Sequence, residues 1–242
     1  TVVVFLPDHG MPFPLAKTCL YHHSTRTPWM VRWPGQIKPG IHDTEHMISA
    51  LDLLPTLLDV AEIEHPNGLE GHSFYRVLKG KKQPELDHVI KEYNESSGRR
   101  RHPMRAVQSK QFNYIFNPWA AGGRKFQAAG QGTLTYQEMI AKAEMDPRTS
   151  KLLKQYDYRV VEEFFDIESD PNNLNNLIDD PKFQDEIANH RAILDQWMEK
   201  TKDPIHAAFQ NREDLRYLDG FVEAQQAQAF RRRDVERERN LK

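Results

Sequence analysis

The sequence predicts an α/β protein that carries a second, smaller α+β unit, and three observations lead to this prediction. Residues 1–6 form a β-branched apolar run, which is typical of a strand buried on both faces of a parallel sheet. A second strand is expected at 28–33, and a helix with apolar residues at helical spacing at 52–61. Beyond Gly80 the pattern changes to short strands and helices, which indicates a separate unit.

The elements of the first region, residues 1–80, have local causes. Pro7 ends the first strand, and Pro34 ends the second. Asp52 is expected to cap the helix that follows, because its carboxylate can accept from the free amides of the first turn. A strand as apolar as the first needs partners on both sides. We therefore expect further strands of the same sheet in a segment N-terminal to this chain.

A polar connector at 80–84 leads into the second region, residues 85–200, which is expected to form an antiparallel sheet with a packed helix. The expected strands are Val89–Tyr93, Arg105–Val107, Phe112–Phe116 and Glu162–Asp166, and the expected helices are Tyr136–Met145, Ser150–Tyr158 and Pro181–Lys200. Asp180 and Pro181 begin the last helix as N-cap and first helical residue. The apolar face of this helix comprises Phe183, Ile187, His190, Leu194 and Trp197.

Composition limits the partners of the chain. Lys and Arg number 33 against 35 Asp and Glu, so a formal charge of -2 gives no general attraction to nucleic acid or to an anionic membrane. Any anion site must therefore be local. No apolar run approaches the roughly 20 residues of a membrane-spanning helix. Residues 201–242 are predicted to be a charged tail.

Two arginine triplets, Arg99–Arg101 and Arg231–Arg233, are basic enough to suggest nucleic-acid binding. The first lacks interleaved aromatic residues and the second is diluted by acidic ones, so solvated faces are the preferred interpretation. The segment His42–His46 matches the H-x-x-E-H pattern of a class of zinc proteases, but its position after Pro39 and Gly40 favours a connecting loop.

The best candidate for chemistry is the tripeptide Asp8-His9-Gly10, directly after the first strand. In open α/β sheets ligands bind beyond the carboxyl ends of the strands. A carboxylate and an imidazole can both face a metal there, and Gly10 permits a sharp turn, although a plain turn is an alternative. Lys17 follows closely enough for its ammonium group to hold an anionic oxygen, with a solvated lysine as the alternative.

Several blocks stand in a characteristic order: Val2–Gly10, Lys17–Tyr21, Arg26–Pro28, Val31–Gly35, Leu51–Asp59, His102–Val107 and Glu163–Leu177. In this order they resemble the C-terminal half of the sulfatases, and most of all the heparan N-sulfatases (N-sulfoglucosamine sulfohydrolases). The resemblance covers residues 1 to about 200. It implies the C-terminal part of an alkaline-phosphatase-like sandwich followed by the α+β subdomain, and a periplasmic, secreted or lysosomal location.

The resemblance also implies roles for single residues. Asp8 and His9 stand where the family places two ligands of a divalent metal, usually calcium, and Lys17 stands where a basic residue contacts the sulfate. Imidazole is a poor ligand for calcium, so manganese or another transition metal stays open. The implied reaction is hydrolysis of a sulfate ester or a sulfamate on a sugar such as a glycosaminoglycan. The residues implied in substrate binding are Glu95, Arg99 and Arg105.

One family feature is absent from the sequence. The family's nucleophile is a formylglycine made from Cys or Ser in a Cys/Ser-x-Pro-x-Arg motif, and no such motif occurs here. Cys19, the only cysteine, is followed by Leu20 and Tyr21, so it is expected to be a small apolar core residue. We therefore expect an N-terminal half of the sulfatase to supply the nucleophile, with this chain as a fragment, a cleaved chain or a truncated product. The alternatives are a phosphate or phosphonate monoester hydrolase of the same superfamily and a non-catalytic fragment.

Overall fold

The computed structural model describes residues 1–96 and 98–240, with the backbone alone for 237–240. The chain forms two compact units. The first unit comprises Thr1–Asp8, Thr27–Val89 and Gln108–Gln111, and the second comprises His9–Arg26, Ile90–Val107 and the chain from Phe112 onward. The loop that carries His9 and Lys17 thus belongs to the second unit, although the segments before and after it in the sequence belong to the first.

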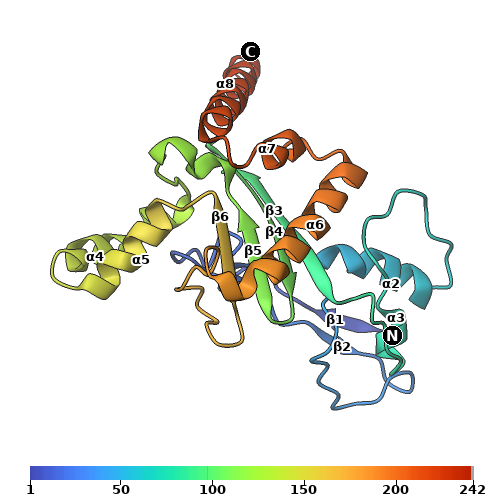
Figure 1. The fold of residues 1–242 in the computed structure, drawn as a ribbon. Coiled ribbons are helices and arrows are strands. Elements are labelled where there is room, and N and C mark those ends of the chain that lie inside the picture. Colours follow the sequence, from blue (N-terminus) through green and yellow to red (C-terminus); the bar gives the residue numbers. More distant parts are fainter. Residues whose placement is uncertain (97, 241–242) are drawn as a thin grey trace. The chain divides into compact units, whose positions relative to one another are not determined.

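The first unit contains a small sheet and short helices (Figure 1). Its elements are β1 (Val3–Phe5), β2 (Met30–Arg32), the 3-10 helix η1 (Ala50–Asp52), α2 (Leu53–Val60) and α3 (Tyr75–Leu78). Ser49 and Asp52 form a reciprocal capping box at the start of η1, in which the Ser49 amide donates to the Asp52 carboxylate at 2.7 Å. Asp52 thus occupies the predicted N-cap position of α2, but its side chain makes no capping bond there and serves the capping box of η1, whose N-cap is Ser49.

The first strand is present, but the described residues do not give it the surroundings predicted for it. β1 pairs antiparallel with β2, with Val4 opposite Val31. Val3 is 50% exposed and Phe5 is 58% exposed, so the described part of the chain does not bury this strand on both faces. An apolar run carries no information on which strands will cover it. The partner strands expected in an N-terminal segment stay a prediction.

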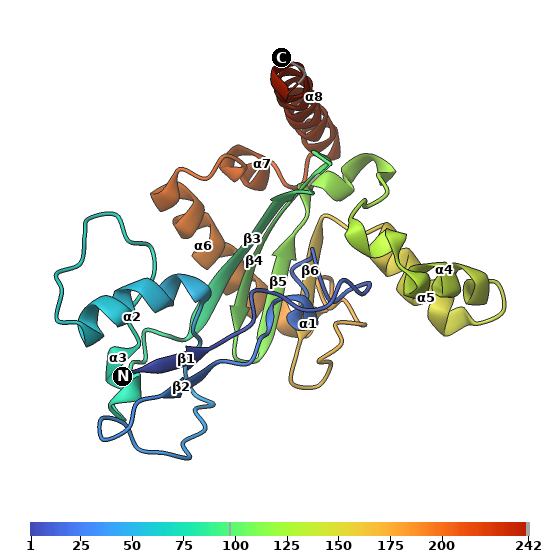
Figure 2. The same cartoon turned by 180° about the vertical axis from the view of Figure 1, so that it is seen from behind.

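The second unit is built on a four-stranded antiparallel sheet in the order β3-β4-β5-β6 (Figure 2). Its strands are β3 (His88–Glu95), β4 (Arg101–Ser109), β5 (Phe112–Phe116) and β6 (Glu162–Asp166). Its helices are α1 (His22–Thr25), η2 (Pro118–Gly123), η3 (Ala129–Gly132), α4 (Leu134–Ala143), α5 (Pro147–Asp157), η4 (Pro181–Phe183), α6 (Gln184–Thr201), α7 (His206–Gln210) and α8 (Leu215–Asn240). The predicted fold class, α/β with an antiparallel sheet and a packed helix, is confirmed. Within this chain the unit with the antiparallel sheet is the larger of the two, and the predicted domain bounds stay a prediction.

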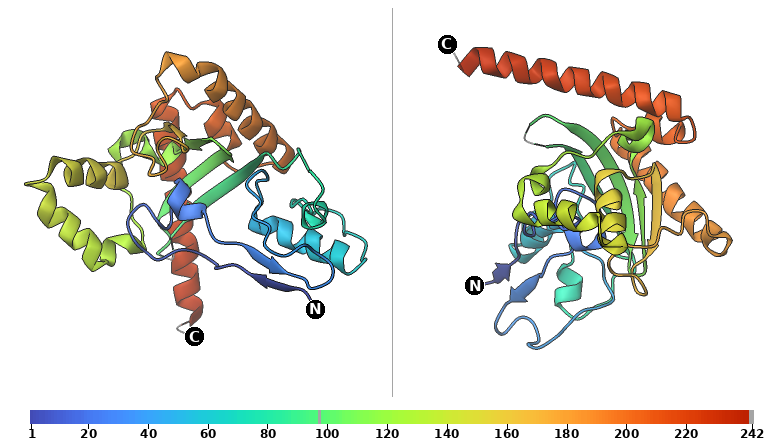
Figure 3. Two further views of the ribbon diagram at one scale, coloured as in Figure 1. Left: turned by 90° about the horizontal axis from the view of Figure 1, so that it is seen from below. Right: turned by 90° about the vertical axis from the view of Figure 1, so that its left-hand side faces the viewer.

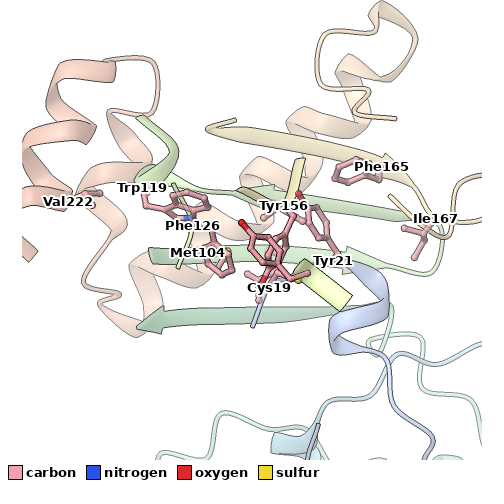
Figure 4. Close-up of a cluster of buried hydrophobic side chains, with 13 residues drawn as sticks. Cys19, Tyr21, Met104, Trp119, Phe126, Tyr156, Phe165, Ile167 and Val222 are labelled. Carbon is pink, nitrogen blue, oxygen red and sulfur yellow. The ribbon is translucent and has the colours of Figure 1, made fainter. Parts of the chain in front are cut away.

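Buried side chains cover both faces of this sheet. Each strand contributes to both faces, since its successive side chains point to opposite sides. On one face, Tyr114 and Phe164 join buried side chains of α6, as the apolar face of that helix predicts. On the other face, Phe165 joins Cys19 and Tyr21. Figure 4 shows Tyr21 and Phe165 within this second cluster, where their rings meet edge to face at 5.8 Å. Cys19 is 3% exposed, as expected for an apolar core residue.

The region predicted as a charged tail contains two helices, α7 and α8 (Figure 3). Phe209, Leu218 and Val222 are at most 2% exposed and belong to the apolar clusters of the second unit. The last two positions of the predicted tail, 241 and 242, lie outside the described residues. None of the described helices combines the length and the apolar character needed to cross a bilayer.

Candidate active-site loop

The structure brings together two of the residues predicted to carry chemistry, His9 and Lys17. The Lys17 ammonium group donates to His9 Nε2 at 3.2 Å, and His9 Nδ1 donates to the carbonyl oxygen of Gly10 at 2.8 Å. These bonds assign the Nδ1–H tautomer to His9, with the Nε2 lone pair directed at Lys17. His9 is exposed and Lys17 is half-buried, so both groups can meet a ligand from solvent.

Asp8 precedes His9 in the sequence and is exposed. It is the last residue of the first segment of the first unit, whereas His9 begins the second unit. Among the described residues, no group of three or more His, Cys, Asp and Glu side chains is arranged to hold a metal. One carboxylate and one imidazole are two donors, fewer than the four or more that a divalent ion takes. Asp8 and His9 therefore fit part of a coordination sphere only when the Lys17 ammonium group turns away from Nε2, the one nitrogen of His9 that carries a lone pair.

The backbone around Lys17 is strained. Leu15 has φ 62° and Thr18 has φ 61°, so both lie in the left-handed region. This conformation is unfavourable for residues with a Cβ and most of all for a β-branched residue such as Thr18. The Thr18 hydroxyl donates to the carbonyl oxygen of Lys17 at 2.6 Å, which fixes the turn locally. Strain of this kind persists only where the surrounding structure holds it, and it concentrates at functional sites.

The residues after Thr18 hold the loop against the sheet. The carbonyl oxygen of Leu20 accepts from the Lys91 ammonium group at 2.7 Å and from the Asn113 side-chain amide at 3.1 Å. The His22 amide donates to Asn173 Oδ1 at 2.8 Å. Leu20 and His22 are buried, and their partners come from β3, β5 and the chain after β6. The position of Lys17 is thus set by contacts that extend across the second unit.

Lys91 is an unusual anchor because its ammonium group is buried. Besides Leu20, it donates to Asn113 Oδ1 at 2.9 Å and to the Thr25 hydroxyl at 3.3 Å. Burial lowers the pKa of Lys91 from 10.5 to about 7, because an ammonium ion loses its hydration inside the protein. The proton that helps to anchor the loop is therefore held less tightly than that of an ordinary lysine.

A buried carboxylate holds Tyr21, the next residue of the anchored segment. The Tyr21 hydroxyl donates to Glu163 Oε1 at 2.8 Å, and the Asn117 side-chain amide donates to Glu163 Oε2 at 2.8 Å. Burial raises the pKa of Glu163, although the nearby Arg159 and these two hydrogen bonds act in the opposite direction. Burial, together with the carboxylate of Glu163, also raises the pKa of Tyr21 well above its ordinary value, so the phenol stays a donor.

Arg159 provides the positive charge near this carboxylate from within an aromatic cage. Its guanidinium group lies 4.3 Å from the ring centre of Phe126, 5.1 Å from that of Tyr21 and 5.5 Å from that of Trp119. Figure 4 shows these three rings in one cluster. The anchored segment therefore packs with aromatic rings and lies near two buried groups of opposite charge, Arg159 and Glu163.

The residues predicted to bind substrate lie in two different environments. Glu95 and Arg99 are within reach of solvent and form an ion pair at 2.6 Å. Arg105 is 1% exposed and donates to Asp203 at 2.7 Å, so its guanidinium group is occupied inside the second unit. The structure thus brings Glu95 and Arg99 together and places Arg105 in a structural role.

The zinc-protease pattern at His42–His46 lies in a loop, as its context predicted. His46 Nδ1 bonds the Asp43 carboxylate at 2.9 Å, and His46 Nε2 accepts from the Gln83 amide at 3.0 Å. Both nitrogens of His46 are therefore occupied by loop contacts. This arrangement gives no support to a zinc site at these residues.

The residues that anchor the loop were not predicted from the sequence. Lys91 and Asn113 lie 71 and 93 positions beyond Leu20 in the sequence, and each looks there like an ordinary polar residue of a strand. Glu163 was expected as part of a strand and of the block Glu163–Leu177, without a role in anchoring the loop. The sequence contained one weak signal for the anchor. Lys91 lies within the expected strand Val89–Tyr93, and a lysine that a strand buries usually needs a partner.

Comparison with known proteins finds similar sulfatase sequences. Residues 9–118 match the family model described as N-sulphoglucosamine sulphohydrolase, C-terminal. The chain is 29% identical over 215 residues to the human N-sulphoglucosamine sulphohydrolase, covering 84% of this chain and 42% of that protein. It is 28% identical over 200 residues to an ulvan-active sulfatase of Formosa agariphila, covering 82% of this chain and 33% of that protein.

A solved structure named as a 2-O GAG sulfatase has the same fold, with a TM-score of 0.60 and 26% identity over 85% of this chain and 38% of that one. The chain spans 33% and 42% of the length of the two curated relatives. The loop with His9 and Lys17 lies inside the segment that the family model matches. In sequence and in fold, the chain is therefore similar to the C-terminal part of sulfatases.

Proposed function

We propose that the protein containing this chain hydrolyses a sulfate ester or an N-sulfate on a sugar, and that the loop from Asp8 to Lys17 forms part of its active site. The observation that supports this most is the 3.2 Å contact between Lys17 and His9 on a strained, anchored loop. A half-buried ammonium group held in one place is suited to an anionic sulfate oxygen.

Each residue of the loop has a role in this proposal. Asp8 and His9 would hold a divalent metal, which would supply positive charge to polarise the sulfuryl group. Lys17 binds a sulfate oxygen and stabilises the negative charge that develops on it. The imidazole of His9 accepts from Lys17 at Nε2 and so keeps the ammonium group near the loop backbone, from which it can turn to the sulfate.

The proposed metal follows from the donors. A carboxylate suits calcium, whereas an imidazole nitrogen suits manganese and other transition ions better than calcium. The further ligands and the nucleophile, a formylglycine, would come from an N-terminal half of the sulfatase. That half is the proposed partner of this chain.

The proposed substrate is a sulfated sugar such as a unit of a glycosaminoglycan. The relatives are named as an N-sulphoglucosamine sulphohydrolase and as an ulvan-active sulfatase, and both names support a sulfated sugar. Glu95 and Arg99, which are paired near solvent, are the proposed contacts to the sugar.

Sulfate release by the whole protein tests this proposal. Ion chromatography would follow sulfate release from N-sulfoglucosamine and from a 2-O-sulfated uronate, with 4-nitrophenyl phosphate as the competing substrate. We expect sulfate release that is lost with a chelator and restored by calcium or manganese. Faster hydrolysis of the phosphate ester, or no turnover of either sulfated sugar with both metals supplied, would contradict the proposal.

A further inference from the structure

The two arginine triplets of the sequence lie side by side in the structure. Residues 99–101 lie at the end of the β3–β4 hairpin, and residues 231–233 belong to α8, far along the chain. Arg99 donates to the Glu236 carboxylate at 2.7 and 2.9 Å, and Arg232 donates to Glu95 at 2.9 Å. The sequence suggested two separate solvated faces, and the fold makes them one surface.

Hydrogen bonds to the hairpin backbone hold the hairpin on α8, in addition to the ion pairs. Gln226 Nε2 donates to the carbonyl oxygen of Arg99 at 2.8 Å, and the amide of Arg101 donates to Gln226 Oε1 at 2.9 Å. A single glutamine thus bridges the backbone on both sides of Arg100. The guanidinium group of Arg101 also donates to Gln225 Oε1 at 3.1 Å. These bonds fix the spacing of the arginines before any ligand binds, which lowers the entropy lost on binding.

We define the arginine surface as Arg99, Arg100, Arg101, Arg232 and Arg233. Arg231 is left out because, at about 100° per residue, it lies on the side of α8 opposite to the residues that contact the hairpin. The acidic residues that pair with these arginines in the part of the chain that the structure describes are Glu95, Asp234 and Glu236. Positive charge therefore exceeds negative charge on this surface, although the whole chain carries a formal charge of -2. A local excess of this kind attracts an anion that the chain as a whole does not.

We propose that the arginine surface binds a sulfated polysaccharide chain. Arginine presents a planar fork of donors that matches the oxygens of a sulfate group, and several such groups at fixed spacing suit a polymer with repeated sulfates. Arg100 and Arg232 are exposed and are the residues of the surface best placed to meet it. This inference rests on the proposed function for the identity of the sugar, and it adds a polymer-binding surface to the sulfate-cleaving loop.

The aromatic content of the surface argues against single-stranded nucleic acid as the ligand. Binding of that kind depends on aromatic rings on which bases stack. The guanidinium group of Arg233 lies 4.5 Å from the ring centre of Phe230, and that of Arg100 lies 5.1 Å from it, so this ring is already used by two cations. Among the described residues, the surface thus offers several cations and no ring of its own that is free for stacking. This favours a sulfated sugar polymer over a single-stranded nucleic acid.

Heparin, a polymer of N- and O-sulfated sugars, is the probe for the test. Its affinity for the whole protein would be measured by titration calorimetry at several salt concentrations. Arg100→Gln/Arg232→Gln is compared with Arg148→Gln/Arg216→Gln, which removes the same charge from exposed arginines elsewhere in the second unit. We expect about tenfold weaker binding and a salt dependence reduced by about two ions for the first variant, with little change for the second.

The variant Arg100→Lys/Arg232→Lys keeps the charge and checks that the loss of affinity in the glutamine variant comes from the lost charge. It should keep the salt dependence of the wild type. Equal heparin affinity in the wild type and in Arg100→Gln/Arg232→Gln would overturn the inference. So would a single-stranded DNA of similar charge that binds as tightly as heparin and responds equally to the substitution. Because heparin binding is measured without turnover, a protein that binds through these arginines but releases no sulfate contradicts the proposed function alone.

Discussion

Lys17 and His9 are held together at 3.2 Å by a loop that is strained on both sides of the lysine and anchored at its end. This relationship connects the fold with the proposed chemistry. The left-handed conformations of Leu15 and Thr18 cost free energy. The hydrogen bonds from Lys91 and Asn113 to the carbonyl oxygen of Leu20 offset that cost. The second unit thus has to maintain the conformation of the loop, which is typical of a functional site.

Asp8 is the residue whose change tests the metal part of the account. Asp8→Asn keeps the shape of the side chain but removes the negative charge that attracts a divalent ion. We expect the concentration of calcium or manganese needed for half-maximal sulfate release to rise at least about tenfold. Asp179→Asn, a change of an exposed aspartate in the second unit, should leave that concentration unchanged. An equal metal requirement in the wild type and in Asp8→Asn would remove Asp8 from the site.

Lys91 predicts a pH dependence of stability. Its pKa is lowered to about 7 in the folded protein from 10.5, so between these values the unfolded chain binds more protons than the folded one. The contribution of Lys91 to the unfolding free energy therefore rises as the pH increases from about 7 to about 10. Urea titrations of the wild type and of Lys91→Met at pH 7 and pH 9.5 test this. The wild type should gain stability relative to the variant at the higher pH, and a constant difference would contradict the prediction.

His102 predicts sensitivity to acid. This residue is 5% exposed, its ring packs edge-on against Trp119 and Phe126, and burial lowers its pKa from 6.5 to about 4. Protonation is thus easier in the unfolded chain, and stability from this group is lost as the pH falls from about 6.5 toward about 4. Replacement by Phe, which cannot be protonated, should remove this loss.

Urea midpoints at pH 7 and pH 4.5 provide the measurement for His102. The difference between the two midpoints should be smaller in His102→Phe than in the wild type. His42→Phe, at an exposed histidine, is the control and should behave like the wild type. An unchanged difference in His102→Phe would show that this ring does not control the response to acid.

Tyr21 tests the anchor beneath the loop. Tyr21→Phe removes the donor to Glu163 and leaves a buried carboxylate with one fewer hydrogen bond, which should cost about 1–3 kcal/mol of unfolding free energy. Tyr217→Phe removes a hydroxyl group from a residue that is 39% exposed and should cost little. Chemical denaturation at neutral pH compares the two. Equal stability of both variants would mean that the bond to Glu163 contributes nothing.

Much of the fold was predictable from local patterns. The strands β5 and β6 were predicted with the bounds that the structure shows, and the helix after Pro181 was predicted from its capping residues and its apolar face. The helix α8 was missed because charged residues dominate its sequence. Leu218 and Val222 have helical spacing, but the apolar stripe that they form is short among the charges.

The candidate site was predictable only in part. The residue types at Asp8, His9 and Lys17, and the resemblance of their blocks to a family, indicated the chemistry. The left-handed conformation of Thr18 could not be predicted, because threonine avoids it and only tertiary contacts impose it. The joining of the two arginine triplets depends on the packing of α8 on a distant hairpin, which no local pattern contains.

Sulfate release by a Lys17→Ala variant tests the central claim most directly. The whole protein and this variant would be assayed on the sulfated sugar that the wild type hydrolyses fastest, with saturating metal and with Lys182→Ala, at an exposed lysine, as the control. If Lys17 stabilises the charge on the sulfate, kcat/KM should fall about 100-fold or more in Lys17→Ala and stay near the wild-type value in the control. An unchanged kcat/KM in a folded Lys17→Ala protein would contradict the account.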